Sequence, residues 1–253
     1  IRILNPLGED TSCMRTTTLP SMLEVLARNW NYRNKSVKLY EFAKVYRKRA
    51  DGLADEPKVL TLGAYGEDMD FYALKGAVEE LCDALLIQNV EYRPVKDDPS
   101  YHPGRCAALY ADGKCLGKFG QVHPLVAKNY GVSAELYAAE LNFQAMFDHR
   151  TTEVYYTPLP RFPSVNRDIA IVCDNALTAG ELMACIREAG GEYLKSCEVF
   201  DVYKGANIPE GKKSVAFSLI LRADDQTLTD AHADEAVQAI LAALHEKYGA
   251  VIR

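Results

Sequence analysis

A short run of basic, aromatic and hydroxyl side chains carries the groups best suited to contact RNA. Arg161 and Arg167 could contact phosphates, and Phe162 between them could stack on a base. Ser164 belongs to the same run. A structural alternative is that Phe162 packs the chain segment before it and Arg167 pairs with an acid. We take all four residues as candidate RNA contacts.

A strand expected over residues 213–222 offers a second candidate surface. Val215, Phe217 and Leu219 alternate with small or polar residues, so one face should pack on helices and leave the other open. The open face has no aromatics of the kind on which an RNA-recognition motif stacks bases. It is therefore solvated, covered by a neighbouring domain, or a platform for RNA. The secondary RNA candidates are Tyr203, Lys212, Lys213, Ser214, Ser218 and Arg222.

Two other kinds of site are disfavoured by residue spacing. The segment Gly205–Ser214 has five residues between its glycines, where a phosphate loop has four, and it connects two expected strands. The seven Cys contain no C-x-x-C, and the five His lie far apart. These patterns predict no metal site, and they favour reduced thiols in a cytoplasmic protein.

Composition and charge narrow the possible classes of protein. The chain has 253 residues, 48% of them hydrophobic and 25% charged, which is typical of a globular protein. No apolar run approaches the ~18–20 residues that cross a bilayer, so no membrane partner is expected. The net charge of −6 excludes a simple basic nucleic-acid binder. The first residue is Ile rather than Met, and no signal peptide follows, so we expect a cytoplasmic protein with an N-terminal part upstream of Ile1.

Three segments are expected: residues 1–150, a linker over 151–160, and residues 161–253. The linker and the residues just after it hold three prolines between Val154 and Pro163, which favours extended chain. The first segment should be α+β, with an antiparallel sheet. Its expected elements are helices beginning at Pro20 and covering Leu74–Leu85, and strands over residues 37–46, 106–111 and 115–122. A hairpin turn is expected at Asp112-Gly113.

The third segment has the order β-α-β-β-α-β of a ferredoxin-like fold. Thr178 and Glu181 form a capping box before one helix, and Thr229 or Asp230 caps the other. The expected strands cover residues 168–173, 198–204, 213–222 and 250–253. This segment holds 10 Lys and Arg against 14 Asp and Glu, so any RNA binding should be selective rather than driven by counterion release.

Several motifs in the third segment resemble the ferredoxin-fold anticodon-binding domain that ends the β subunits of the bacterial phenylalanyl-tRNA synthetase family. They occur in the family's order, at Pro160–Asp168, Val199–Gly205, Gly211–Ser214, Gln226–Thr229 and Gly249–Arg253. The first segment resembles the degenerate class II synthetase core of the same subunits. That likeness lies at Met14–Leu26, Leu39–Arg47 and Phe119–Pro124.

The resemblance implies a ligase subunit of protein biosynthesis. Residues 1–150 would scaffold an (αβ)2 assembly with a catalytic α subunit, and residues 161–253 would bind the anticodon stem-loop of phenylalanine tRNA. The holoenzyme would charge this tRNA with phenylalanine, using ATP and Mg²⁺ that are bound outside this segment. The alternative is a protein-interaction scaffold whose ferredoxin-like domain packs on a partner subunit without reading RNA.

The core itself is expected to have no catalytic residues. Amino-acid activation needs cations from class II motifs 2 and 3 to neutralise phosphate charge. Arg47 matches the motif 2 arginine, but Arg49 stands where an acid is expected. The strand Tyr137–Phe143, which corresponds to motif 3, holds no cation. We expect His123 to have a hydrogen-bonding and packing role rather than a catalytic one.

Overall fold

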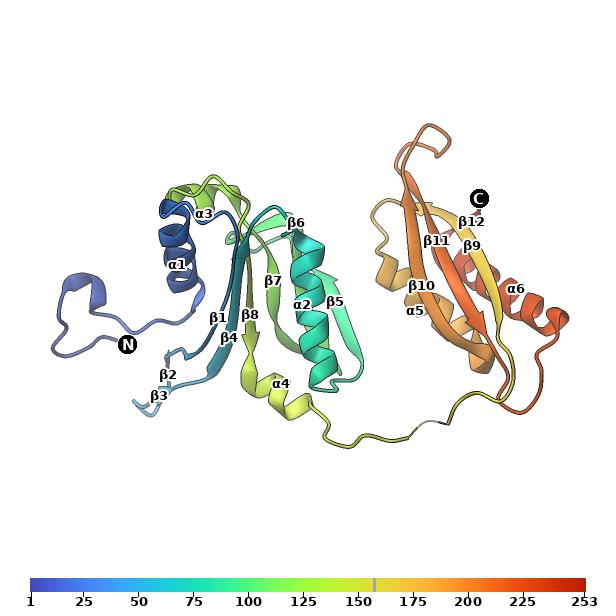
Figure 1. Cartoon of the computed structure of the whole chain (residues 1–253), viewed down its shortest axis with the longest axis horizontal. Helices are drawn as coiled ribbons and strands as arrows, with labels where there is room; N and C mark the ends of the chain where they lie inside the picture. Colours follow the sequence, from blue (N-terminus) through green and yellow to red (C-terminus); the bar gives the residue numbers. More distant parts are fainter. Residues whose placement is uncertain (157) are drawn as a thin grey trace. The chain divides into compact units, whose positions relative to one another are not determined.

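Both units of the chain consist of antiparallel sheets with helices packed against them. The computed structural model describes residues 1–156 and 158–253, so Thr157 of the expected linker lies outside the described residues. The chain divides into Ile1–Val154 and Tyr155–Arg253 (Figure 1). No helix among the described residues has the length and apolar character needed to cross a membrane.

A six-stranded sheet organises the first unit. Its strands run in the order β1-β4-β8-β7-β6-β5, and every neighbouring pair is antiparallel. These strands are β1 (Val37–Lys44), β4 (Lys58–Tyr65), β5 (Val90–Pro94), β6 (Tyr101–Ala111), β7 (Lys114–Val122) and β8 (Tyr137–Asn142). A two-stranded ribbon joins β2 (Arg47–Lys48) to β3 (Ala54–Asp55). The helices are η1 (Glu9–Thr11), α1 (Leu19–Asn31), α2 (Phe71–Ala84), α3 (Pro124–Asn129) and α4 (Phe143–His149).

Helices cover both faces of this sheet. Helix α1 packs Leu23 and Leu26 with Ala138 of β8, whereas α2 packs Leu74 and Val78 in the cluster that holds Ala139. Successive strand residues point to opposite faces, so Ala138 and Ala139 belong to different cores. Figure 1 shows α1 and α2 on opposite sides of the strands.

The β6–β7 hairpin depends on backbone conformations that the sequence specifies. Asp112 and Gly113 have φ values of 47° and 77°, the positive pair that suits a tight turn between twisted strands. Farther along β7, a Cβ on Gly120 would lie 2.3 Å from the carbonyl oxygen of Arg105 and 2.7 Å from the Cα of Cys106. Only glycine therefore allows β6 to approach β7 this closely.

The second unit is ferredoxin-like, as predicted. Its elements alternate in the order β-α-β-β-α-β, and its sheet has the strand order β10-β11-β9-β12 with all neighbours antiparallel. They are β9 (Val165–Asp174), α5 (Ala179–Ala189), the short η2 (Gly191–Tyr193), β10 (Leu194–Tyr203), β11 (Lys212–Leu221), α6 (Asp230–Tyr248) and β12 (Val251–Ile252). Val215, Phe217 and Leu219 of β11 are buried against the helices, which confirms the predicted apolar face.

Local capping fixes where the two long helices of this unit begin and end. Thr178 accepts a hydrogen bond from the Glu181 N–H, and the Glu181 carboxylate accepts from the Thr178 N–H, so the predicted capping box is present. Thr229 caps α6 in the same way, by accepting from the His232 N–H. Gly249 ends α6 in the left-handed conformation, with φ of 61°.

Most of the thiols lie inside the two cores. Cys82, Cys106, Cys173, Cys185 and Cys197 are buried, whereas Cys13 and Cys115 are exposed. Burial raises the pKa of Cys82, Cys106 and Cys197 to about 11 in each case. None of the seven forms a disulfide in this structure.

Replacing Gly120 by Ala should destabilise the first unit by about 1–3 kcal/mol or more, because β6 and β7 must separate to admit a methyl group. Gly76→Ala is the matched control. Nothing lies within 4 Å of a Cβ at this position inside α2, so the change should stabilise by up to about 1 kcal/mol. Chemical denaturation of both variants checks the pair, and equal effects would contradict the close-approach argument.

Candidate nucleic-acid interface

The face of the second sheet that points away from the helices gathers several predicted RNA contacts. Ser218 of β11 pairs with Asp168 of β9 and with Glu198 of β10, and Ser214 pairs with Tyr203. Directly opposed residues of antiparallel strands share a face, so these side chains lie together. The topology therefore brings Tyr203, Ser214 and Ser218 to one surface.

This face is less open than the strand pattern predicts. Ser214 is 3% exposed and Ala216 is also buried, whereas Ser218 is partly exposed. Ser214 lies between Tyr203 on β10 and Val172 on β9, and both neighbours are larger. A serine flanked by two large side chains is covered without any partner protein. Of the two serines, Ser218 is therefore the more accessible.

The side chain that lies over Tyr203 was absent from the sequence-based candidates. The guanidinium of Arg253 sits 5.0 Å from the centre of the Tyr203 ring, a cation–π contact that spans the sheet from β12 to β10. Tyr203 remains 37% exposed. An aromatic ring paired with a guanidinium can stack on a base and attract its phosphate. The only signal in the sequence was that Arg253 is the last residue of the short strand expected over residues 250–253.

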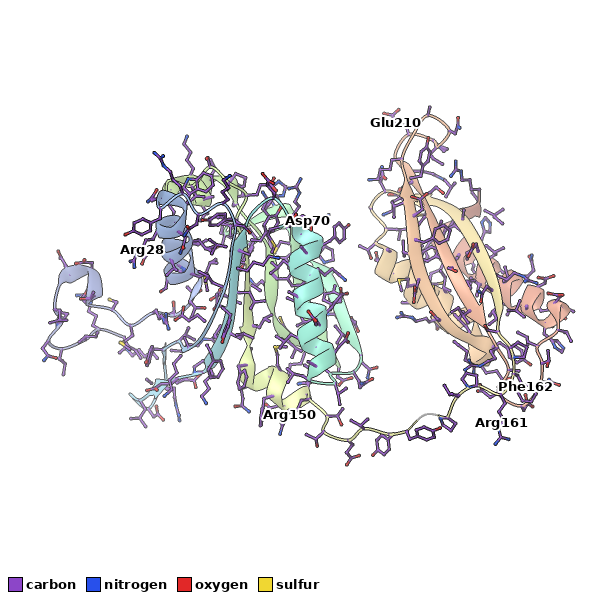
Figure 2. All side chains as sticks on the ribbon, viewed as in Figure 1. Arg28, Asp70, Arg150, Arg161, Phe162 and Glu210 are labelled. Atoms are coloured by element: carbon purple, nitrogen blue, oxygen red, sulfur yellow. The ribbon has the colours of Figure 1, made fainter. Side chains whose placement is uncertain are left out.

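The three candidate residues just before β9 differ in how exposed their side chains are. Arg161 is exposed and forms no ion pair within the described residues, and Ser164 is exposed as well. Phe162 is half-buried. Figure 2 shows the Arg161 side chain extending from the chain where it enters the second unit. Arg161 is thus available to an anion.

Arg167, in contrast, is engaged by its own fold. It pairs with Leu219, on the helix-facing side of the sheet, and reaches the first turn of α6. Its guanidinium donates to Asp230 at 2.8 Å and to Asp234 at 3.2 Å. Hydrogen bonds to these two carboxylates raise the pKa of Arg167. This arrangement is the structural alternative considered above, a pairing with acids.

The adjacent lysines of β11 also differ. Lys213 lies on the helix-facing side, and its amine donates to the backbone carbonyls of Asn175 and Leu177 in the loop before α5. Lys212 is exposed on the opposite side, in line with Ser214. Arg222 follows β11, and its Nε lies 3.7 Å from Asp224. Lys212 is the lysine that faces solvent beside the candidate surface.

The charges on this surface are divided between its two ends. At one end, Ser218 is flanked on the neighbouring strands by the exposed carboxylates of Asp168 and Glu198. Asp201 lies next to them, where it pairs with Ala216. The other end carries Arg253 and Lys212. A phosphate backbone would be repelled by the first end and attracted by the second.

The first unit contains the residues that bear on catalysis. On β8, the carboxylate oxygen Glu140 Oε1 accepts from Thr17 Oγ1 at 2.5 Å, from the Thr18 N–H at 2.8 Å and from the Leu19 N–H at 3.3 Å. Arg49 pairs with Asp51 at 2.7 Å. A carboxylate thus lies on β8, the strand expected from its sequence to correspond to class II motif 3.

His123 has a structural position in the same unit. It is the N-cap residue of α3, and its Nδ1 accepts a hydrogen bond from the Leu125 N–H at 3.2 Å. The predicted hydrogen-bonding role of His123 is confirmed by this contact.

Exchanging each of the paired lysines for methionine should separate their roles. Lys213→Met removes hydrogen bonds to two loop carbonyls and should destabilise the second unit by about 1–2 kcal/mol. Lys212→Met should change the stability by less than about 0.5 kcal/mol, because its side chain is exposed. Urea denaturation followed by amide NMR intensities of residues 165–252 measures both. A larger loss for Lys212→Met would contradict this assignment.

Comparison with known proteins agrees with the resemblance seen in the sequence. Residues 1–143 match the family described as "Phenylalanyl tRNA synthetase beta chain CLM domain". Residues 160–253 match the "Ferredoxin-fold anticodon binding domain".

Curated relatives match along the whole chain. The phenylalanine–tRNA ligase β subunit of Clostridium tetani is 42% identical over 255 residues, and that of Clostridium acetobutylicum is 39% identical. Each alignment covers 100% of this chain and 32% of the relative, so the chain spans about a third of the length of these proteins. A solved pyrrolysyl tRNA synthetase of Desulfitobacterium hafniense aligns at a TM-score of 0.47 and 13% identity, over 56% of this chain and 51% of that one.

The family match over residues 1–143 extends across more than half of the chain, and it agrees with the motifs at Met14–Leu26, Leu39–Arg47 and Phe119–Pro124. The chain therefore belongs to the phenylalanyl tRNA synthetase beta chain family.

Proposed function

We propose that this chain is the C-terminal part of a phenylalanine–tRNA ligase β subunit, and that residues 161–253 bind the anticodon stem-loop of phenylalanine tRNA. Residues 1–150 scaffold the assembly with the α subunit, and residues 151–160 link the two parts. The α subunit then charges the tRNA with phenylalanine at the expense of ATP. Two family matches, one over each unit, support this proposal.

The observation that carries the RNA-binding role is the pairing of Tyr203 with Arg253. A stem-loop presents unstacked bases that proteins bind by stacking and by hydrogen bonding. Tyr203 and Arg253 supply the ring and the cation on one face, and Lys212 lies farther along it. The carboxylates of Asp168 and Glu198 at the other end disfavour general binding of a phosphate backbone. Selective binding of a loop fits this charge distribution.

The candidate contact residues differ in whether their side chains are accessible to RNA or already engaged within the fold. Arg161, Tyr203, Lys212 and Arg253 offer accessible groups, and Phe162, Ser164 and Ser218 lie beside them in sequence or on the same face. Arg167, Lys213, Ser214 and Arg222 are engaged or covered by the fold, so their contributions to RNA binding are expected to be smaller.

The first unit is proposed to be non-catalytic. ATP carries several negative charges, and Glu140 on β8 would repel them where activation needs a cation. The residues of this core therefore do not fit ATP. In this proposal ATP and Mg²⁺ are bound by the α subunit, within a cytoplasmic (αβ)2 heterotetramer.

One observation favours the alternative, a scaffold that packs on protein. Both edge strands of the second sheet carry exposed apolar side chains, Phe200 and Val202 on β10 and Val251 and Ile252 on β12. Exposed apolar side chains at sheet edges are suited to cover by a partner. Stable capture of the α subunit by residues 161–253, together with no RNA footprint there, would support this function instead.

Titration of the whole chain with the anticodon stem-loop of phenylalanine tRNA, against the same loop with a scrambled anticodon, tests the RNA-binding role. The cognate loop should bind more tightly, and amide NMR shifts should centre on residues 161–164 and on Tyr203. Two salt concentrations are needed, because phosphate contacts weaken with salt. Equal binding of the two loops would contradict anticodon reading.

A matched pair of arginine variants tests which residues make the contact. Arg161→Ala should weaken binding several-fold and lower the salt dependence by about one phosphate contact. Arg167→Ala should weaken it less, because this guanidinium is already held by Asp230 and Asp234. The reverse order would show that Arg167 leaves its acids to bind RNA.

Pyrophosphate exchange with phenylalanine and ATP tests the non-catalytic assignment of the core. The isolated chain should give no exchange above the background without protein. Exchange that disappears in Arg47→Gln would overturn the assignment.

A further inference from the structure

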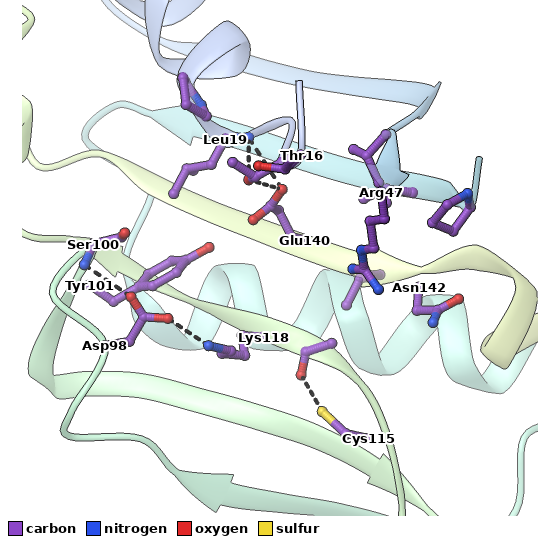
Figure 3. A pocket seen from close by; sticks show the side chains of 17 residues that line it. Thr16, Leu19, Arg47, Asp98, Ser100, Tyr101, Cys115, Lys118, Glu140 and Asn142 are labelled. Atoms are coloured by element: carbon purple, nitrogen blue, oxygen red, sulfur yellow. Dashed lines mark hydrogen bonds and ion pairs between the residues drawn. The ribbon is translucent and has the colours of Figure 1, made fainter. Parts of the chain in front are cut away.

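A cavity of about 510 Å³ lies in the first unit, whereas the candidate RNA surface belongs to the second (Figure 3). Strands β7 and β8, the start of α1 and the segment around Arg47 form its walls. Its volume lies within the range of small-molecule sites in proteins.

A buried hydroxyl without a partner points into this cavity. Tyr101 is 3% exposed, and its OH group forms no hydrogen bond within the described part of the chain. Figure 3 shows the Tyr101 ring extending from the Asp98 side, with its hydroxyl on the side toward Glu140. An unsatisfied buried hydroxyl costs free energy, and native proteins rarely retain one without a role. A ligand group that donates or accepts a hydrogen bond would satisfy it.

Two charged side chains that line the same cavity, Glu140 and Arg47, could also bind a ligand. Glu140 receives its hydrogen bonds from the start of α1 at Oε1, which leaves Oε2 without one among the described residues. Arg47 lines the cavity and forms no ion pair in the same described part. The second cation, Lys118, is occupied by Asp98 at 2.6 Å. The cavity therefore offers the Arg47 cation, the Glu140 Oε2 oxygen and the buried Tyr101 hydroxyl, and the hydroxyls of Thr16 and Ser100 line it as well.

The rest of the lining combines apolar and polar side chains. The apolar ones are Leu19, Pro20, Val45, Pro57, Val59 and Leu141, and the polar ones are Thr16, Thr17, Ser100 and Asn142. The apolar side chains suit the short hydrocarbon body of a small ligand. Glu140 also excludes ligands that carry several negative charges, since it faces the same space.

We propose that this cavity binds a small carboxylic acid that also carries an amino or hydroxyl group. The carboxylate pairs with Arg47, the amino or hydroxyl group lies between the Tyr101 hydroxyl and Glu140 Oε2, and the apolar body fills the rest. An ammonium and a hydroxyl share the chemistry that matters, because either can donate to Glu140. The site is independent of RNA binding by the second unit.

Titration of the whole chain with hexanoate and with its derivatives bearing an amino or hydroxyl group at carbon 2 or carbon 6 tests the ligand class. At least one derivative should bind about tenfold more tightly than hexanoate. The derivative that binds most tightly would show whether the ligand's hydrogen-bond donor is an amino or a hydroxyl group and how far it lies from the carboxylate. Calorimetry with concentrations up to ~20 mM detects even millimolar binding. Derivatives that bind no better than hexanoate would overturn the proposal.

The exposed thiol of Cys115 locates the bound probe. Cys115 lines the cavity, whereas Cys13 is exposed elsewhere in the same unit and serves as an internal control. The tightest probe should slow alkylation of Cys115 by iodoacetamide and leave the rate at Cys13 unchanged. Equal effects at both thiols, or none at either, would mean that the probe binds outside this cavity.

Two variants and one control test the assigned contacts. Arg47→Gln should weaken the tightest probe about tenfold, whereas Arg49→Gln should not, because Arg49 pairs with Asp51 outside the lining. Tyr101→Phe should reduce the affinity of that probe toward that of hexanoate. The same variant without ligand should melt at an unchanged or higher temperature, since it removes an unsatisfied hydroxyl. A lower melting temperature, or equal losses for both arginine variants, would overturn the assignment.

Discussion

The first unit depends on a single carboxylate that joins a helix to the middle of a sheet. The N-cap position of α1, Thr18, makes no side-chain capping bond, so the free N–H groups of the first turn need another acceptor. Glu140 provides it from β8, and a negative charge at a helix N-terminus is favourable. The contact fixes α1 over one face of the sheet, and with it the core that holds Leu23 and Leu26. The same carboxylate sets the polarity of the cavity beneath.

Local signals in the sequence were sufficient to predict the turns and caps but not the surface. Asp112-Gly113 and Thr178 act on neighbouring residues, so their structures follow from types and spacing. The contact between Arg253 and Tyr203 joins two strands that are not neighbours in the sheet, and no short-range pattern encodes it. The cover over Ser214 is equally non-local, since it depends on which residues of β9 and β10 face it. Strand alternation identified the two faces correctly but could not indicate how far each is exposed.

Cations that are close in the sequence differ in whether the fold pairs them, because the backbone sets the direction in which each side chain points. Lys212 and Lys213 are adjacent in β11, so they point to opposite faces, and only Lys213 reaches the carbonyls before α5. Arg161 lies before β9, whereas Arg167 lies within it and meets α6. Charge counts treat these side chains as equivalent. Among residues 1–156 and 158–253, Lys212 and Arg161 form no ion pair, so the fold determines which cations can act on a ligand.

Each unit contains buried thiols whose reactivity depends on local opening of that unit. Cys82 and Cys106 lie in the cores of the first unit, and Cys173, Cys185 and Cys197 lie in that of the second. A buried thiol reacts with an alkylating reagent only when its surroundings transiently open, so its labelling rate measures the local free energy of that opening. Mass spectrometry of the labelled peptides would therefore yield two separate stability profiles from one native, unmodified chain. The exposed Cys13 and Cys115 would supply the reference rates in the same sample.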